Sequence, residues 1–417
     1  MTALSALLAA VLAGSPAAGS QASDDGPAIQ LVESFPVETS LDHPDLPEAA
    51  QVWLAMIGRA SRRLDFAQFY ASDTAGSRLE PIVAAIEQAA ARGVSVRFLA
   101  EKKFHATYPG TLDRLAAQAG IEVRLFDVGA LMGGVLHAKY FLVDGREAYV
   151  GSQNFDWRAL DHILELGVRV RDPGVADAFQ RVFEYDWTLA GGGSRDTDAP
   201  PSSVPDAEDA RVAASVMLLS AGDGAPPETL RVTPVFSPRE WLPAGARWDL
   251  PEIVSLIDQA RGTVRVQLLT YRSAGREGDY FDDLENALRR AAGRGVQVQM
   301  LLSDWSQRRG IIESLQSLEV LPGIEVRLVT IPPWSGGFIP FSRVIHAKYL
   351  VVDGSAAWIG TSNWERDYFH GSRNAGLILA GGGLPSRLEG FFLDVWRSPY
   401  AAPVDPCSTY TAPRIGG

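Results

Sequence analysis

The sequence predicts an α/β protein built from two similar lobes, and three observations support this fold class. The segment VLHAKYFLVDGREAYVGSQN at residues 135–154 returns 209 positions later as VIHAKYLVVDGSAAWIGTSN at residues 344–363. Upstream of each copy, β-rich runs alternate with helical patterns in the same order, which favours a mixed, largely parallel sheet in each lobe. The chain of 417 residues, 46% of them hydrophobic, is also long enough for two hydrophobic cores.

Each lobe is expected to contain the same elements in the same order, because the chain repeats its own pattern at a fixed period. A buried strand comes first, followed by a helix, a β-rich strand, a second helix and another strand. The signature hairpin, a further strand and a closing amphipathic helix complete the lobe. The predicted segments of the first lobe are 62–70, 78–93, 94–100, 111–120, 121–128, 135–154, 163–170 and a helix ending at Trp187; those of the second are 262–271, 281–295, 296–302, 311–320, 324–331, 344–363, 374–380 and a helix ending at Trp396.

Composition predicts the domain boundaries. The N-terminus resembles a secretory signal peptide, with an apolar run, small residues and SQA ending at Ala22, although no Lys or Arg precedes the run. We therefore expect a secreted or periplasmic protein. A stretch dense in Gly, Pro, Ser and Asp indicates a linker, whose second part forms either a strand or an exposed flap. The predicted divisions are 1–25 (signal peptide), 26–189 (first lobe, with a lead-in at 26–48), 190–232 (linker and insert), 233–402 (second lobe) and 403–417 (tail).

Charge and composition narrow the classes of partner. The 38 basic and 50 acidic residues give a formal net charge of −12, so a polyanion has to be bound locally and not by a broad basic surface. The single cysteine, Cys407, excludes an intramolecular disulfide and a cysteine-based metal site. The six histidines form no metal-binding motif, and no apolar run is long enough to span a bilayer. We expect no metal and no cofactor; peripheral membrane contact and the oligomeric state stay open.

The repeated signature brings a histidine and a lysine together in each lobe. Side chains two apart on an extended strand point the same way, so His137 shares a face with Lys139, and His346 with Lys348. An imidazole that acts as nucleophile or acid beside a permanent cation suits an anionic phosphoryl group. A solvated strand end is the alternative, but burying so many matched polar groups without purpose is costly.

The aspartates of the signature are expected to have a structural role. Asp144 is an odd number of positions from both the histidine and the lysine of its copy, so on a regular strand it points away from them. We expect Asp144, and Asp353 in the second copy, to brace the strand end or a neighbouring segment.

The turn after the hairpin supplies neutral polar groups. Asn154 and Asn363 offer amide donors that, with the two lysines, would face the non-bridging oxygens of one phosphodiester. Ser152 and Ser362 either hold the turn through local hydrogen bonds or contact the phosphate.

Substitution at a phosphodiester explains why the signature occurs twice. One imidazole bonds to phosphorus while the opposing one protonates the leaving oxygen and later activates water. Glu165 lies 21 residues after Asp144, whereas Asn374 occupies the corresponding place in the second copy. A carboxylate behind an imidazole fixes its tautomer and stabilises its cation. We therefore predict His137 as the nucleophile and His346 as the general acid.

These residues resemble the duplicated H-x-K-x4-D and G-[ST]-x-N signature of the phospholipase D superfamily, over roughly residues 45–400. The stretches IPFSRVIHAKYLVVDG, GTSNWERDYF and FFLDVWRSPY are similar to the branch of animal lysosomal 5′-exonucleases and poxvirus envelope phospholipase-like proteins. The resemblance implies two pseudo-twofold-related α/β/α sandwich lobes that share one site, and a metal-independent phosphodiesterase with a phosphohistidine intermediate. Animal members act on single-stranded DNA and RNA from the 5′ end, and phospholipid transphosphatidylation is also attributed to the branch.

The favoured function is therefore a phosphodiesterase acting on 5′ ends of single-stranded nucleic acid. A phospholipase D or phosphatidyl transferase is the enzymatic alternative, which an exposed apolar rim around the pocket would favour. A basic groove with aromatic rings would favour nucleic acid. A non-catalytic, envelope-associated binding protein is a further alternative, against which the intact His, Lys and Asn residues of both copies count.

Overall fold

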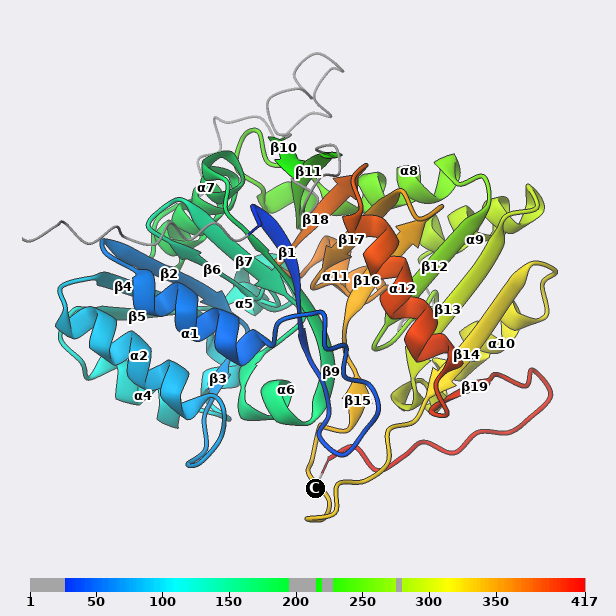
Figure 1. Ribbon diagram of the computed structural model, residues 1–417, viewed down its shortest axis with the longest axis horizontal. Coiled ribbons are helices and arrows are strands. Elements are labelled where there is room, and N and C mark those ends of the chain that lie inside the picture. Colours follow the sequence, from blue (N-terminus) through cyan, green and yellow to red (C-terminus); the bar gives the residue numbers. More distant parts are fainter. Residues whose placement is uncertain (1–26, 195–214, 220–227, 275–279, 417) are drawn as a thin grey trace, which may run out of the picture.

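Two lobes lie side by side, each a β-sheet flanked by helices (Figure 1). The computed structural model describes residues 27–194, 215–219, 228–274 and 280–416. The predicted signal peptide at 1–25 lies outside the described residues, as does most of the predicted linker. Within the described parts of the chain, no helix is both long and apolar enough to cross a membrane.

The first lobe has the strand order β1-β9-β7-β6-β2-β4-β5. Successive side chains of a strand face opposite sides, so Phe141 and Val143 pack with α1 and α2 while Tyr140 and Leu142 pack with α7. Its elements are β1 (Ile29–Ser34), α1 (Ala49–Arg59), β2 (Arg63–Gln68), β3 (Ala71–Ser72), α2 (Glu80–Ala91), β4 (Ser95–Glu101), α3 (Lys102–His105), α4 (Gly110–Ala116), β5 (Ile121–Phe126), α5 (Val128–Met132), β6 (Tyr140–Val143), β7 (Glu147–Gly151), β8 (Phe155–Asp156), α6 (Trp157–Asp161), β9 (Ile163–Val170) and α7 (Pro173–Ala190).

The second lobe repeats this plan with the strand order β10-β11-β18-β17-β16-β12-β13-β14-β19. Its elements are β10 (Ser215–Leu219), β11 (Glu228–Ser237), the 3-10 turn η2 (Arg239–Trp241), α8 (Asp249–Gln259), β12 (Thr263–Leu268), α9 (Asp283–Gly293), β13 (Gln297–Ser303), η3 (Asp304–Gln307), α10 (Ile312–Glu319), β14 (Ile324–Val329), β15 (Val344–Ile345), β16 (Lys348–Val352), β17 (Ala356–Gly360), α11 (Arg366–His370), β18 (Asn374–Ala380), α12 (Leu384–Arg397) and β19 (Ala401–Pro403). Every strand and helix of the predicted repeat is therefore present in both lobes.

The two mixed α/β lobes are confirmed, but the expectation of largely parallel sheets is wrong. Along the strand orders of the two main sheets, β2-β4-β5 and β12-β13-β14 pair in parallel. The other neighbours in these strand orders are antiparallel. The reason is the length of the connections. β6 and β7 are joined by the three residues 144–146, far too few for the crossover that a parallel pair requires.

One hydrophobic core joins the two lobes. Buried side chains of α7, such as Phe179 and Phe183, belong to the same cluster as Phe391 and Phe392 of α12. Two further clusters fill the outer layers beneath α1 and α2 in the first lobe and beneath α8 and α9 in the second. The lobes are therefore held together by apolar burial, which fixes the position of the space between them.

The structure adds three details to the predicted divisions. β11 crosses the predicted division between residues 232 and 233, so the end of the predicted insert is a strand of the second sheet and not a flap. The lead-in contains β1, which pairs with β9. The tail returns toward the second lobe's loop, where the backbone N–H of Phe341 donates to the carbonyl oxygen of Ile415 at 2.8 Å.

Candidate active site

Each signature histidine docks on the opposite lobe, at β9 in the first lobe or directly before β18 in the second. Leu136 forms a bridge with Arg373, and the backbone N–H of His137 donates to the Arg373 carbonyl at 2.8 Å. In the other direction, β15 pairs in parallel with β9, and the backbone N–H of His346 donates to the Leu164 carbonyl at 2.8 Å. Both histidines therefore enter the space where the two lobes meet.

Because each histidine docks on the other lobe, the hydrogen-bond partner of each Nδ1 comes from that lobe. Nδ1 of His346 lies 2.8 and 2.9 Å from the two carboxylate oxygens of Glu165, and Nδ1 of His137 lies 3.1 Å from the Asn374 side-chain oxygen. The rings are buried, with 5% exposure for His137 and 7% for His346. With each Nδ1 engaged, Nε2 is the nitrogen left for chemistry.

The predicted pairing of Glu165 with His137 is wrong. Glu165 follows Leu164 on β9, the strand on which the second lobe's segment docks, so its carboxylate reaches His346. The spacing along the chain favoured a contact between Glu165 and the histidine of its own lobe. The docking of each histidine on the other lobe instead brings Glu165 to the histidine of the second lobe. The assignment of His137 as nucleophile rested on this pairing and loses its basis.

The two lysines are buried beside the histidines. Nζ of Lys139 donates to the His137 carbonyl at 2.7 Å, and Nζ of Lys348 donates to the His346 carbonyl at 2.5 Å. Burial lowers the pKa of Lys348 to about 7, although Glu165 opposes the shift. Burial and then the charge of Lys348 hold the pKa of Lys139 well below its usual range. An anion bound near the two ammonium groups would raise both pKa values.

Charged groups of both lobes shift the pKa of His137. Burial holds the pKa of His137 well below its usual value, and Lys139, Lys348 and His346 lower it further. Burial also lowers the pKa of His346 to about 4, against the opposing effect of Glu165. For Glu165 itself burial raises the pKa, but His346 and then Lys348 outweigh it, so that the pKa is lower than usual.

The two asparagines differ in their surroundings. Asn363 is buried and its amide nitrogen donates to the Tyr368 hydroxyl at 3.0 Å, whereas Asn154 is half-buried. The Tyr368 ring in turn meets the His137 ring at a centroid distance of 5.0 Å. Among the described residues, the side-chain oxygens of both asparagines lack a hydrogen-bond partner. Both amides therefore retain hydrogen-bonding capacity in the site.

The aspartates of the signature brace the sheet, as the odd spacing predicts. The Asp144 carboxylate accepts from the backbone N–H groups of residues 61, 62 and 63 at 2.7 to 3.0 Å. Asp353 accepts from those of residues 261, 262 and 263 at 2.7 to 2.9 Å. Each aspartate thus ties the signature hairpin to the start of β2 or β12.

The two predicted serines are not equivalent. The Ser152 hydroxyl donates to the Leu166 carbonyl at 3.1 Å and accepts from its N–H at 3.0 Å, so it holds the turn against β9. Ser362 instead donates to Asp249 at 3.2 Å. The counterpart of Ser152 is Thr361, whose hydroxyl donates to the Asn374 side-chain oxygen at 2.9 Å.

Sequence reasoning missed Thr361 and Glu101. The signal for Thr361 was present, because it lies 209 positions after Ser152 whereas Ser362 lies 210 after it. Glu101 is buried and accepts from the Leu136 N–H at 2.6 Å, which positions the residue directly before His137. No spacing in the sequence indicates this contact. Its second carboxylate oxygen accepts from the N–H of Lys103 at 3.1 Å.

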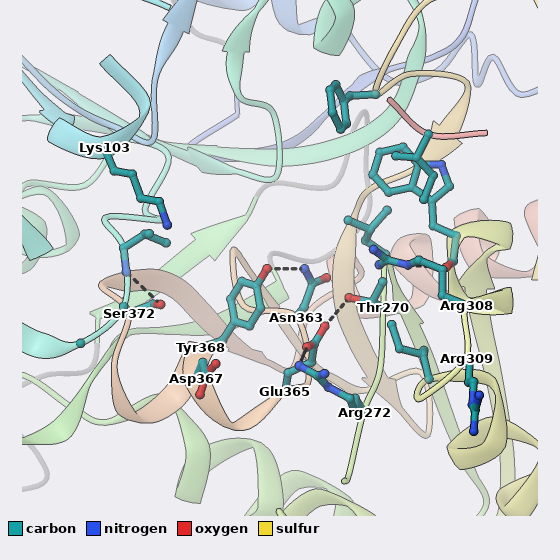
Figure 2. Close-up of a pocket in the computed structure, with 18 residues that line it drawn as sticks. Lys103, Thr270, Arg272, Arg308, Arg309, Asn363, Glu365, Asp367, Tyr368 and Ser372 are labelled. Carbon is teal, nitrogen blue, oxygen red and sulfur yellow. Dashed lines mark hydrogen bonds and ion pairs between the residues drawn. The ribbon is translucent and has the colours of Figure 1, made fainter. Parts of the chain in front are cut away.

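A cavity of about 620 Å³ adjoins the site, and Figure 2 shows its lining. Asn363 and Tyr368 belong to both the cavity and the catalytic cluster. Lys103 stands on one side, and Arg308 and Arg309 stand on the other. Its aromatic walls are Trp305, Phe341 and Tyr368, and its remaining charged side chains are Arg272, Glu365 and Asp367. The described residues contain no group of three His, Cys, Asp or Glu side chains placed to hold a metal ion.

A comparison with known protein families identifies the family to which this chain belongs. A family model described as cardiolipin synthase, PLD-like domain, matches residues 53–187 and 253–396, one match in each lobe. The chain belongs to the phospholipase D superfamily. It is accordingly a phosphodiesterase of the phospholipase D type, with the two signature copies brought to one site between the lobes.

Relatives that match most of this chain include an exonuclease and a phospholipase D by name. The human 5'-3' exonuclease PLD3 is 31% identical over 404 residues, covering 90% of this chain and 80% of the relative. Mouse 5'-3' exonuclease PLD4 is 30% identical, covering 90% of this chain and 79% of the relative. Phospholipase D Z of Dictyostelium discoideum is 30% identical and covers 91% of each chain.

Solved structures support the fold alone. Phosphatidylserine synthase of Haemophilus influenzae superposes with a TM-score of 0.60 at 12% identity, covering 85% of each chain. Polyphosphate kinase of Porphyromonas gingivalis superposes with a TM-score of 0.52 at 13% identity, over 91% of this chain and 48% of the other. The fold is thus shared with these two proteins.

Proposed function

We propose that this phospholipase D-type enzyme hydrolyses single-stranded nucleic acid from its 5′ end through a phosphohistidine on His346. The observation that carries the proposal is a pair of imidazoles from opposite lobes beside a cavity lined by cations and aromatic rings. Such a cavity suits a chain of phosphates and bases, because cations attract the backbone and bases stack on aromatic faces. The exonuclease names of two relatives point the same way.

In the first step, Nε2 of His346 attacks phosphorus, and the bond from phosphorus to the leaving oxygen breaks. The leaving oxygen takes the proton from Nε2 of His137. The new phosphoimidazolium carries positive charge, which the carboxylate of Glu165 stabilises at 2.8 Å. Asn374 behind His137 is neutral, so it does not retain the proton that His137 has to release.

In the second step, neutral His137 accepts a proton from water while the water oxygen attacks phosphorus. The P–N bond to His346 breaks and both histidines return to their starting protonation states. The phosphoryl product leaves with one oxygen derived from water.

Four neutral or cationic side chains would bind the non-bridging oxygens. Lys139 and Lys348 supply charge. Asn154 and Asn363 supply amide N–H groups, of which Asn363 has one beyond the N–H that it donates to Tyr368. This set of donors can stabilise the added charge of a pentacovalent phosphorus without a metal. We therefore expect turnover to persist in EDTA.

A phospholipid substrate is the second candidate, and one observation favours it. Leu131, Phe338 and Phe341 are among the large apolar side chains exposed on the described surface, and Phe341 lines the cavity with 48% of its surface exposed. Exposed rings near a site are typical of contact with lipid. The name of the Dictyostelium relative, phospholipase D Z, agrees with this candidate.

A parallel assay with purified protein separates the two substrates. The substrates are a 5′-hydroxyl oligonucleotide, the same oligonucleotide with a 5′-phosphate, and phosphatidylcholine, each with EDTA and across acidic to neutral pH. We expect stepwise loss of nucleotides from the 5′ end and no release of choline. Choline release with intact oligonucleotides would favour the lipid candidate. Failure to hydrolyse even bis(p-nitrophenyl) phosphate would indicate the non-catalytic alternative.

A further inference from the structure

The pseudo-twofold arrangement leads one to expect two equal spaces beside the two imidazoles. Equivalent positions follow from the sheet contacts: the Glu101 N–H donates to the Phe69 carbonyl at 3.3 Å, and the Ser303 N–H donates to the Leu269 carbonyl at 3.3 Å. Leu269 is therefore the counterpart of Phe69. The residues at these two strand ends decide how much room is left on each side.

Aromatic rings fill the space on the first lobe's side. The Phe69 ring lies 4.0 Å from the Phe104 ring and 5.0 Å from the His137 ring, measured between centroids. Tyr70 stacks on both Phe104 and Tyr108. Together these rings cover His137 on that side.

Smaller side chains leave the second lobe's side open. By the same strand pairing, the counterparts of Phe69, Tyr70 and Phe104 are Leu269, Thr270 and Ser306. Leu269 and Thr270 line the 620 Å³ cavity. The site is therefore asymmetric, and among the described residues the second lobe's side has room for a nucleotide-sized group.

The cations of this open side are not all neutralised. Arg272 forms an ion pair with Glu365 at 2.7 Å. Lys103 and Arg308 form no ion pair with any carboxylate among the described residues, and Arg308 lies close enough to Tyr368 to lower the pKa of its hydroxyl, against the larger raising effect of burial. Asp367 is the carboxylate that remains in the lining. In a chain with a net charge of −12, this local excess of positive charge indicates an anionic ligand.

The cavity also offers a surface for a base. Trp305 is half-buried, its ring lies 6.4 Å from that of Phe341 in an edge-to-face pair, and both rings line the cavity. The Trp305 carbonyl accepts from Nε of Arg308 at 3.0 Å, which ties the guanidinium to the backbone of Trp305. Figure 2 shows the Arg308 side chain directed toward the middle of the cavity, with Lys103 opposite.

We propose that this cavity binds the nucleotide on the 3′ side of the scissile phosphodiester, with the next phosphate between Arg308 and Lys103 and the base against Trp305. The inference rests on the proposed function and adds that the substrate needs a second phosphodiester for full activity. A strand attacked at its 5′ end has its further phosphates on the 3′ side of the first bond. The enzyme therefore prefers substrates that carry a second phosphodiester there.

The test compares a 5′-hydroxyl dinucleotide, which has one phosphodiester, with the matching trinucleotide, which has two. For the parent enzyme we expect kcat/KM for the first bond to rise about tenfold from dinucleotide to trinucleotide, since one charge-assisted phosphate contact has about this effect. Arg308→Gln and, separately, Lys103→Gln should remove most of that gain. Arg146→Gln, an exposed arginine in the hairpin turn outside the cavity lining, is the matched control for charge and should keep it.

The outcomes separate this inference from the function on which it rests. A parent that hydrolyses bis(p-nitrophenyl) phosphate but neither oligonucleotide contradicts the proposed function, and the inference fails with it. A parent that cleaves dinucleotide and trinucleotide equally well overturns the inference alone, as does full retention of the gain by both Arg308→Gln and Lys103→Gln. Hydrolysis of the small diester by each variant, reported as the ratio of kcat/KM values, corrects for a loss of folded protein.

Discussion

Glu165 is the residue whose placement most affects the proposed chemistry. Its carboxylate meets Nδ1 of His346, while the amide oxygen of Asn374 meets Nδ1 of His137. One imidazole therefore has a negative charge behind it and the other does not. This difference favours a covalent bond to His346, because the phosphoimidazolium that forms there gains a counter-charge.

Replacing Glu165 with Gln should move the acidic limb of the pH profile. The nucleophile must be neutral, so kcat/KM falls as the pH drops through the pKa of His346, about 4. Glu165 raises that pKa, and its removal lowers the pKa further. We expect the acidic limb of the E165Q variant to shift to lower pH and kcat to fall, as measured by initial rates on bis(p-nitrophenyl) phosphate.

The reciprocal variant serves as the control. Asn374→Asp places a carboxylate behind His137 and raises the pKa of this general acid. With an oligonucleotide, whose leaving alcohol needs a proton, the alkaline limb of kcat/KM should therefore move to higher pH. An acidic limb that stays in place in E165Q would contradict the proposed role of His346.

Residue roles were predictable from sequence only where they depend on local geometry. The odd spacing of Asp144 correctly predicted a bracing role, because alternation along a strand is a local property. The partners of the two imidazoles were not predictable, because each histidine docks on the other lobe. Tyr368 has no aromatic counterpart in the first copy, where Ala159 stands 209 positions earlier, so the repeat gave no signal for it.

The signature hairpin shows how one side chain fixes an element. Asp144 adopts a left-handed backbone conformation at φ 54° and accepts three backbone N–H groups at the start of β2. Asp144→Ala should lower the free energy of unfolding by about 2 kcal/mol, because these donors lose their partner. Asp144→Asn keeps an acceptor oxygen and tolerates the same backbone conformation, so its loss should be smaller. Urea denaturation measures both.

The kcat of the D144A variant shows whether Asp144 has a structural role or acts in the reaction. Under conditions in which the D144A variant is fully folded, its kcat should stay near that of the parent, since the carboxylate faces residues 61–63 and not the site. A large loss of kcat in folded D144A would mean that the aspartate acts in the reaction.

Elements were the most predictable feature of this chain. The order of strands and helices follows from the duplicated pattern, and β9 and β18 fall at 163–170 and 374–380 as expected. Whether neighbouring strands pair in parallel or antiparallel was harder to predict from the sequence, because it depends on the length of the segment that connects them. A hairpin turn of three residues forces β6 and β7 to run antiparallel, whereas the helices α2 and α9 permit parallel pairs at β2-β4 and β12-β13.

The contact between the lobes depends on a buried ion pair as well as on apolar packing. Arg373 lies next to the site, and its guanidinium meets the Asp186 carboxylate of α7 at 2.9 and 3.1 Å. Both side chains are fully buried. The Arg373 carbonyl also accepts from the His137 N–H, so the same residue links the lobe interface to the reaction centre.

Removing one member of this pair should destabilise the whole molecule. Arg373→Met leaves the buried Asp186 without its partner, so this group has to stay charged or take up a proton, which should lower the free energy of unfolding by about 3 to 5 kcal/mol. The double variant R373M/D186N removes the orphaned charge and should recover much of the loss. Equal stability of the single and double variants in urea denaturation would contradict this account of the interface.

The molecule as a whole is two incomplete halves that form one reaction centre. Each lobe supplies one histidine, one lysine and one asparagine, and supports the histidine of the other lobe. The duplication predicted this sharing. The asymmetric cavity was not predictable, because it results from side chains such as Phe69 and Leu269 outside the repeated signature.

The most direct test of the shared centre is a burst experiment, in which the His137→Ala variant reacts with an excess of bis(p-nitrophenyl) phosphate. Its leaving group departs without a proton, so His346 should still attack, while release by water should fail for lack of the His137 base. We predict a burst of one equivalent of p-nitrophenol, then a stall, with mass spectrometry locating the phosphoryl group on His346. His346→Ala should give no burst. A burst from His346→Ala with the phosphoryl group on His137, or near-parent turnover by either variant, would contradict the account.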